Sequence, residues 1–167
     1  KNLVGAFKQP KCVICDSDVL STLSDEIISD GMAEAIKYGM IRDAELFDLI
    51  ATHTLDNVNE IIDEIVYKCI SIKRNVVEND EFDTGERMIL NFGHTLGHAI
   101  ESYYNYQTYT HGSAVSIGMC MITERGCEKY ITDKLISCVT AYKLPSCCDA
   151  PINELIKLCS NDKKCCL

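Results

Sequence analysis

Residues 91–101 read Asn-Phe-Gly-His-Thr-Leu-Gly-His-Ala-Ile-Glu, and they place His94 and His98 four positions apart in an otherwise apolar segment. With Arg87 included, polar residues recur at steps of 4, 3, 4 and 3, which form one stripe along a helix face. A surface helix carries a broad polar face instead. We therefore expect the stripe to face a hydrated or ligand-filled interior, where a metal or a hydrogen-bond partner satisfies the imidazoles.

The composition favours one domain with a substantial core. The 167 residues are enough for such a domain, and the net charge of -9 argues against a nucleic-acid partner. No apolar run approaches the roughly 20 residues that a membrane-spanning helix needs, so we expect no membrane partner. The eleven cysteines are scattered and odd in number, which favours free thiols in a reducing cytoplasm over a disulfide scaffold.

The hydrophobic periodicity predicts a mostly α fold, a helical bundle with one short leading strand. Residues 11–15, Lys-Cys-Val-Ile-Cys, follow Pro10 and contain enough β-branched residues for that strand. Asp16 then begins a turn that caps the first helix. The helices expected beyond it span residues 17–23, 25–41, 43–54, 57–78, 85–104, 112–129, 131–142 and 151–159.

A second polar group interrupts the apolar helix expected over residues 25–41. Glu34 and Lys37 are three positions apart and therefore neighbours on one helix face, and Asp30 continues the same stripe. Small and apolar residues surround them, which predicts an enclosed pair. An ordinary helical salt bridge also explains this pair when it is taken alone.

Two more polar residues occupy unusual positions. Lys73 falls within the apolar face of the helix at 57–78, where its ammonium group either extends to solvent or contacts an anion, and the pattern leaves both open. His111 precedes Gly112 at the entry of an apolar helix, a position that can direct a side chain into a pocket. His53 shows no partner pattern, so we interpret it as structural.

Carboxylate and imidazole groups of this kind are the ligands that catalytic zinc sites use, commonly three from the protein with one position left for water or substrate. The candidate ligands are Glu34, His94, His98 and His111. The residues themselves leave open which histidine of the pair would bind. The His-Glu-x-x-His order of metalloproteases is absent.

Cations near the same expected cavity indicate an anionic substrate, such as a phosphate or a carboxylate. These cations are Lys37, Lys73 and Arg87. A metal ion and cationic side chains that hold an anionic substrate in the same cavity can together support catalysis, so we expect an enzyme.

Several blocks of the sequence resemble the C-terminal domain of the 3-dehydroquinate synthase family, within the sugar-phosphate cyclases. The most specific is Leu-Asn-Phe-Gly-His-Thr-Leu-Gly-His-Ala-Ile-Glu at residues 90–101. The others keep the family's order and nearly its spacing over essentially the whole chain. They start at Lys1 (Lys-Asn-Leu-Val-Gly-Ala-Phe), Gly31 (Gly-Met-Ala-Glu-Ala-Ile-Lys-Tyr-Gly), Ile72 (Ile-Lys-Arg-Asn-Val-Val), Gly85 (Gly-Glu-Arg), His111 (His-Gly), Leu144 (Leu-Pro) and Asp162 (Asp-Lys-Lys).

The resemblance implies a lyase of the shikimate pathway that converts 3-deoxy-D-arabino-heptulosonate 7-phosphate to 3-dehydroquinate and phosphate, with NAD and Zn²⁺ or Co²⁺ as cofactors. The implied metal ligands are Glu34, His94 and His111. The implied catalytic residues are His98 as a base or proton relay, Asp83 as a proton acceptor, Lys37 and Lys73. The implied substrate-binding residues are Asn2, Glu34, Lys37, Lys73, Arg87, Asn91, His94, His111 and Lys163, with Lys164 as the alternative to Lys163. Residues bordering the NAD site would be Lys1, Val19, Leu20 and Thr22.

The resemblance also implies a homodimer, and an N-terminal α/β domain that binds NAD. No G-x-G-x-x-G motif occurs in this chain. We therefore expect residues 1–167 to be the C-terminal metal- and substrate-binding helical domain of a longer cytoplasmic protein, inactive when isolated. Two alternatives stay open: another sugar-phosphate cyclase, or a non-catalytic helical interaction module.

Overall fold

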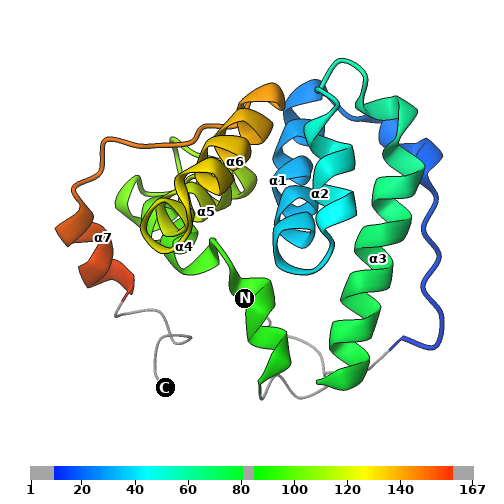
Figure 1. The fold of residues 1–167 in the computed structure, drawn as a ribbon, viewed down its shortest axis with the longest axis horizontal. Coiled ribbons are helices and arrows are strands. Elements are labelled where there is room, and N and C mark those ends of the chain that lie inside the picture. Colours follow the sequence, from blue (N-terminus) through cyan, green and yellow to red (C-terminus); the bar gives the residue numbers. More distant parts are fainter. Residues whose placement is uncertain (1–9, 81–84, 160–167) are drawn as a thin grey trace.

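The computed structural model describes residues 10–80 and 85–159, and these residues form an all-helical arrangement (Figure 1). The elements in chain order are η1 (Ser17–Thr22), α1 (Asp25–Arg42), α2 (Ala44–Ala51), η2 (Val58–Glu60), α3 (Ile62–Asn79), η3 (Glu86–Asn91), α4 (His94–Tyr103), α5 (His111–Gly126), α6 (Lys129–Ala141) and α7 (Ile152–Cys159), where η denotes a 3₁₀ helix. The mostly helical fold expected from the periodicity is confirmed. None of these helices is both long and apolar enough to cross a membrane.

The strand expected at residues 11–15 is wrong. These residues have no regular secondary structure and are exposed, with Val13 68% and Ile14 88% accessible. A strand needs a neighbour to pair its backbone N–H and C=O groups. The part of the chain that the structure describes contains no strand, so the β-branched residues have nothing to pair with.

The single helix expected over residues 85–104 is also wrong. The structure divides this segment into η3 and α4, because Gly93 adopts the left-handed conformation with φ of 79°. Glycine reaches this region without the steric penalty of a Cβ. The chain turns there and a new helix begins at His94. Arg87 and Asn91 thus lie on η3, while His98 and Glu101 lie on α4, and the polar stripe is not one continuous helix face.

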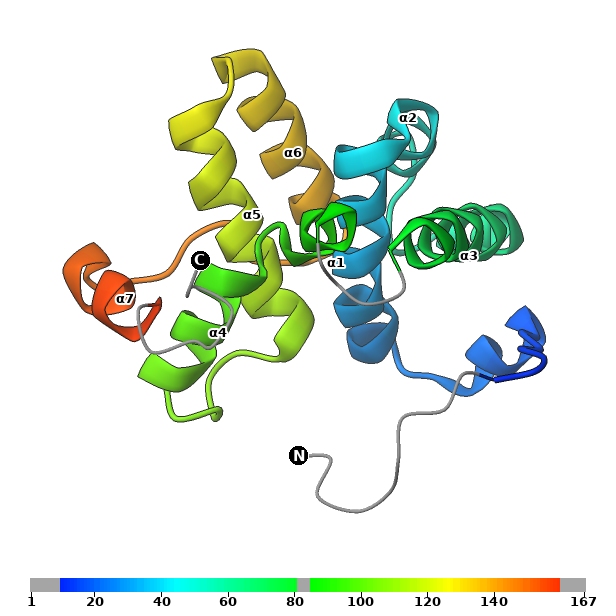
Figure 2. The ribbon, with the colours of Figure 1, turned by 90° about the horizontal axis from the view of Figure 1, so that it is seen from below.

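The main core joins α1, α2, α3, α5 and α6. Its fully buried side chains include Ile36 of α1, Leu46 of α2, Met119 of α5 and Leu135 of α6. Figures 1 and 2 show α3 and α7 at opposite ends of the molecule, with α1 between them. A smaller apolar cluster connects α4, α5 and α7. Helices α1, α4 and α5 therefore have fixed positions, and they carry the polar residues discussed next.

Candidate metal centre

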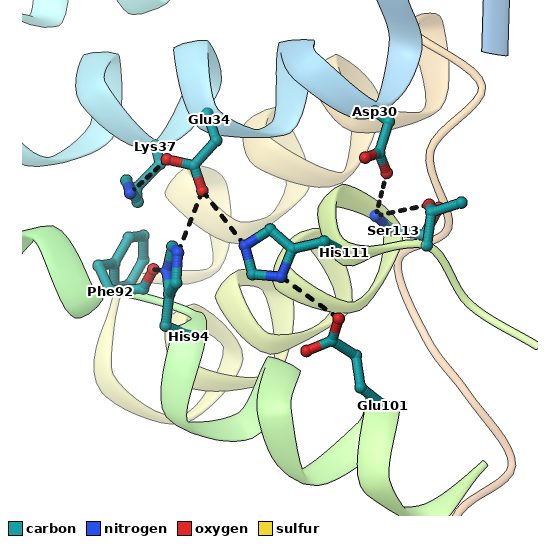
Figure 3. Close-up of polar contacts among 9 residues, drawn as sticks. Asp30, Glu34, Lys37, Phe92, His94, Glu101, His111 and Ser113 are labelled. Atoms are coloured by element: carbon teal, nitrogen blue, oxygen red, sulfur yellow. Dashed lines mark hydrogen bonds and ion pairs between the residues drawn. The ribbon is translucent and has the colours of Figure 1, made fainter. Parts of the chain in front are cut away.

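Three side chains from three helices meet at one point, as Figure 3 shows. Oε1 of Glu34, on α1, lies 3.1 Å from Nε2 of His94, on α4. The same oxygen lies 4.0 Å from Nε2 of His111, on α5. One potential ligand atom from each residue lies within 4.8 Å of the others. The structure thus brings together the carboxylate and two of the imidazoles that the sequence singled out.

The carboxylate of Glu34 also contacts a buried cation. Its second oxygen, Oε2, accepts a hydrogen bond from Nζ of Lys37 at 2.6 Å, and Lys37 is only 3% exposed. Burial by itself would raise the pKa of Glu34, but contacts with His94 and Lys37 outweigh it and lower the pKa to about 2. The group is therefore ionised at neutral pH. The pair expected from the sequence is present, but only Lys37 is enclosed, since the Glu34 side chain is 36% exposed.

Each histidine begins its helix, and each has a second contact through Nδ1. His94 follows Gly93 at the start of α4, and its Nδ1 lies 3.3 Å from the carbonyl oxygen of Phe92. His111 is the first residue of α5, and its Nδ1 lies 3.3 Å from Oε1 of Glu101. In both cases Nε2 is the nitrogen that faces Glu34.

A close approach between α5 and α1 places His111 beside Glu34. A Cβ on Gly112 would lie 2.1 Å from the backbone oxygen of Asp30, so only glycine fits there. The backbone N–H of Ser113 donates to Oδ1 of Asp30 at 3.2 Å, as Figure 3 shows. Asp30, which the sequence placed on the stripe of Glu34, therefore holds the first turn of α5 against α1.

The donor set fits a divalent metal ion. Oε1 of Glu34 is buried and accepts no hydrogen bond from any described residue, although two imidazole nitrogens lie near it. A buried acceptor without a donor is unfavourable by about 1–3 kcal/mol. A cation bound between one carboxylate and two imidazoles would remove this penalty, and zinc commonly takes such ligands.

His98 lies one turn beyond His94 on α4. Its ring centre is 5.8 Å from that of His94 and 6.0 Å from that of His111. His98, Glu101 and His111 form a second group whose potential ligand atoms lie within 4.8 Å of one another. The sequence placed Glu101 on the polar stripe but not among the predicted site residues, although its place three residues after His98 was the available signal.

The remaining predicted residues lie on elements around this cluster. Arg87 and Asn91 are half-buried on η3, which packs against α1 and α3. Lys73 on α3 is exposed, so it is not enclosed in the apolar face of that helix. Val19, Leu20 and Thr22 lie on η1, which packs against α3. Lys1, Asn2, Asp83, Lys163 and Lys164 lie outside the described residues.

A pocket of about 370 Å³ lies between α2 and α6, away from these side chains. It is lined by Asp48, Ala51, Thr52, Lys134, Ser137 and Cys138. None of these residues belongs to the cluster around Glu34, so we assign the pocket no part in the site.

The similarity of this chain to known proteins identifies the family to which it belongs. The family model described as 3-dehydroquinate synthase C-terminal matches residues 31–165. The chain belongs to this family. It is 51% identical over 177 residues to the 3-dehydroquinate synthase of Clostridium botulinum (strain Alaska E43 / Type E3), an alignment that covers 98% of the chain and 49% of that protein.

Two further 3-dehydroquinate synthases show how far this similarity extends. The chain is 55% identical over 135 residues to that of Clostridium perfringens (strain SM101 / Type A), covering 80% of the chain and 39% of the relative. It is 40% identical over 173 residues to that of Streptococcus suis (strain 05ZYH33), an alignment that covers 98% of the chain and 48% of the relative. The chain spans about half the length of the 3-dehydroquinate synthases that it matches over nearly its whole length.

A solved structure supports the same fold. The 2-epi-5-epi-valiolone synthase of Streptomyces hygroscopicus subsp. jinggangensis 5008, with NAD⁺ and Zn²⁺ bound, aligns with a TM-score of 0.81 at 20% identity. The alignment covers 98% of this chain and 48% of that protein. The helical arrangement of this chain is thus also found in that synthase.

Proposed function

We propose that this chain is the metal- and substrate-binding half of a 3-dehydroquinate synthase, which converts 3-deoxy-D-arabino-heptulosonate 7-phosphate to 3-dehydroquinate and phosphate. The observation that carries the proposal is the meeting of Glu34, His94 and His111 beside the buried Lys37. Relatives named 3-dehydroquinate synthase, at 40–55% identity, support it.

In this proposal Glu34, His94 and His111 hold one zinc or cobalt ion. When bound, the metal would polarise a substrate hydroxyl and NAD would supply reversible hydride transfer. An ammonium group has three N–H donors, and the contact with Glu34 uses one of them. Lys37 can therefore hold an anionic oxygen of the substrate beside the metal.

Other described residues would orient the substrate and move protons. His98 lies beside both histidine ligands and would accept or return a proton near the metal. Arg87 and Asn91 on η3 would bind the substrate from the side of α1 and α3. The exposed ammonium group of Lys73 would contact the phosphate from α3.

NAD would bind mainly to a part of the protein outside these 167 residues, with η1 at its border. Two observations support this division: the chain spans about half the length of relatives such as that of Clostridium botulinum, and it contains no G-x-G-x-x-G motif. We accordingly propose that the isolated chain is inactive, and an assay of the 167-residue chain with substrate, NAD and zinc tests this.

The decisive experiment uses the whole protein as its gene encodes it. We expect about one zinc ion per chain and phosphate release from the heptulosonate phosphate in the presence of NAD. Glu34→Gln should abolish both zinc binding and turnover. Glu26→Gln, at the exposed start of the same helix, should preserve both. A wild-type protein without metal, or a Glu34→Gln variant that keeps it, contradicts the proposal.

Substrate profiling separates the two alternatives. A 3-dehydroquinate synthase would turn over 3-deoxy-D-arabino-heptulosonate 7-phosphate, whereas another sugar-phosphate cyclase would prefer a different sugar phosphate. A non-catalytic helical module would be well folded yet bind no zinc and turn over neither compound.

A further inference from the structure

The two histidines that face Glu34 are oriented by different kinds of group (Figure 3). Nδ1 of His94 contacts a backbone oxygen, that of Phe92, whereas Nδ1 of His111 contacts a side chain, the carboxylate of Glu101, both at 3.3 Å. A neutral imidazole carries one N–H, and the hydrogen bond made by one nitrogen decides which nitrogen is protonated. Which nitrogen of His111 is protonated therefore depends on the side chain of Glu101, which a mutation can change.

We infer that Glu101 is a positioning residue, which holds His111 with Nδ1 protonated and Nε2 free to bind a cation beside Glu34. An ionised carboxylate only accepts hydrogen bonds, so the proton of this contact belongs to Nδ1. Nε2 of His111 is then an acceptor with its lone pair available, on the side of Glu34. The inference rests on the proposed metal site and names the residue that orients one of its ligands.

His111 needs this support more than His94 does. The side chain of His111 is 45% exposed, against 14% for His94, so its neighbours restrict the ring less. The side chain of Glu101 is only 13% exposed. It projects from α4, which packs along α5, as Figure 3 shows. The packing of these two helices therefore fixes the acceptor relative to the imidazole, as in the carboxylate–histidine–metal arrangements of many metal sites.

The same side chains offer one competing arrangement. Glu101 also belongs to the group formed with His98 and His111, which could hold a second cation directly. In that case Glu101 would be a ligand and the protein would bind two ions per chain. In our inference the protein binds one ion, and Glu101 acts through His111.

The test measures zinc binding and the protonated nitrogen of His111 in the whole protein. Glu101→Ala should weaken zinc binding by about 10–100-fold. Glu101→Gln retains an oxygen that accepts from Nδ1, and should recover much of that loss. Glu124→Ala removes an exposed glutamate from the last turns of α5 and should bind zinc as the wild type does.

In the metal-free protein, nitrogen NMR of the imidazoles reports the tautomer directly, with the His111 signal assigned by its disappearance in His111→Gln. We expect the Nδ1-protonated form in the wild type and in Glu101→Gln, and a mixture of both forms in Glu101→Ala. A defect of folding alone would not change the tautomer selectively, and thermal unfolding of both variants identifies such a defect.

Two results would overturn the inference: an Nδ1-protonated His111 and wild-type zinc affinity in Glu101→Ala, or two zinc ions per wild-type chain with one lost in that variant. A wild-type protein that binds no zinc would instead refute the proposed function. The tautomer of His111 would then still decide the role of Glu101, because that measurement needs no metal.

Discussion

Gly118 of α5 lies directly against the backbone of Gly93, since a Cβ on Gly118 would be 2.2 Å from the Gly93 carbonyl oxygen. Gly93 immediately precedes α4, which begins at His94. This contact therefore joins the start of α4 to α5, the helix that begins with His111. The distance between the two imidazoles therefore depends on the absence of side chains at these positions.

Gly118→Ala should destabilise the protein by about 1–3 kcal/mol, because the added methyl group forces α4 and α5 apart. The same displacement should weaken zinc binding, since it moves His94 relative to His111. Thermal unfolding of the metal-free protein and a zinc titration measure the two effects. The control is Gly126→Ala on the same helix, where no atom lies within 4 Å of the added Cβ. Equal behaviour of the two variants would show that this close approach is unimportant.

Asp80 should prove necessary for the position of Arg87. Asp80 is 7% exposed, and its Oδ2 accepts from the backbone N–H groups of Gly85 and Arg87, both at 2.9 Å. Asp80→Ala leaves these donors without that acceptor, and should destabilise the protein by about 1–3 kcal/mol. Because η3 then loses its anchor, the KM of the whole protein for the proposed heptulosonate phosphate should rise more than kcat falls. Glu78→Ala, at an exposed position in the last turn of α3 just before Asp80, should change neither stability nor KM.

Asp43 should give the stability of the protein a defined pH dependence. Its Oδ1 accepts from the N–H of Leu46 at 2.9 Å and caps α2, while Oδ2 lies 3.2 Å from Nζ of Lys68. The hydrogen bond from Leu46, aided by Lys68 and opposed by partial burial, lowers the pKa of Asp43 below its usual value of 3.8. At pH 7, Asp43→Ala should destabilise the protein by about 1 kcal/mol.

The sign of this effect follows from the lowered pKa in the folded state. The contribution of Asp43 is fully present above the unfolded-state pKa of about 3.9, and it is lost as the pH falls through the lower folded-state value. Urea unfolding at pH 7 and below pH 4 should therefore show the difference between wild type and Asp43→Ala shrinking in acid. For Asp56→Ala, at an 84% exposed position, we expect almost no difference at either pH.

The cysteines should differ sharply in their reactivity with thiol reagents. Burial raises the pKa of Cys120 and of Cys138 to about 12, and the thiolate is the reactive form. Alkylation at pH 8, followed by peptide mass spectrometry, should modify the exposed cysteines first and these two only after denaturation. Among the described residues, the exposed cysteines are Cys12, Cys15, Cys127 and Cys147. Rapid labelling of Cys120 in the native protein would contradict the described core.

Helices with long, regular apolar patterns were predicted well from the sequence, whereas segments governed by backbone conformation were not. The helix expected at residues 25–41 is α1, Asp25–Arg42, which carries apolar residues from Ile27 to Ile41 and contains no proline. The helix expected at 85–104 is divided at Gly93, whose positive φ no periodicity reveals. Residues 11–15 have strand-like composition, but composition cannot supply a pairing partner.

The sequence by itself determined the residue types of the site, the helical class of the fold and the family to which the chain belongs. Only the tertiary structure decided that Nε2 of His94 lies nearest the buried oxygen of Glu34, and that Glu101 contacts the opposite nitrogen of His111. Periodicity fixes the face of a helix on which a side chain lies, because that is a local property. The partner of that side chain depends on how separate helices pack, and here glycine contacts set the packing of α5 against α1 and α4.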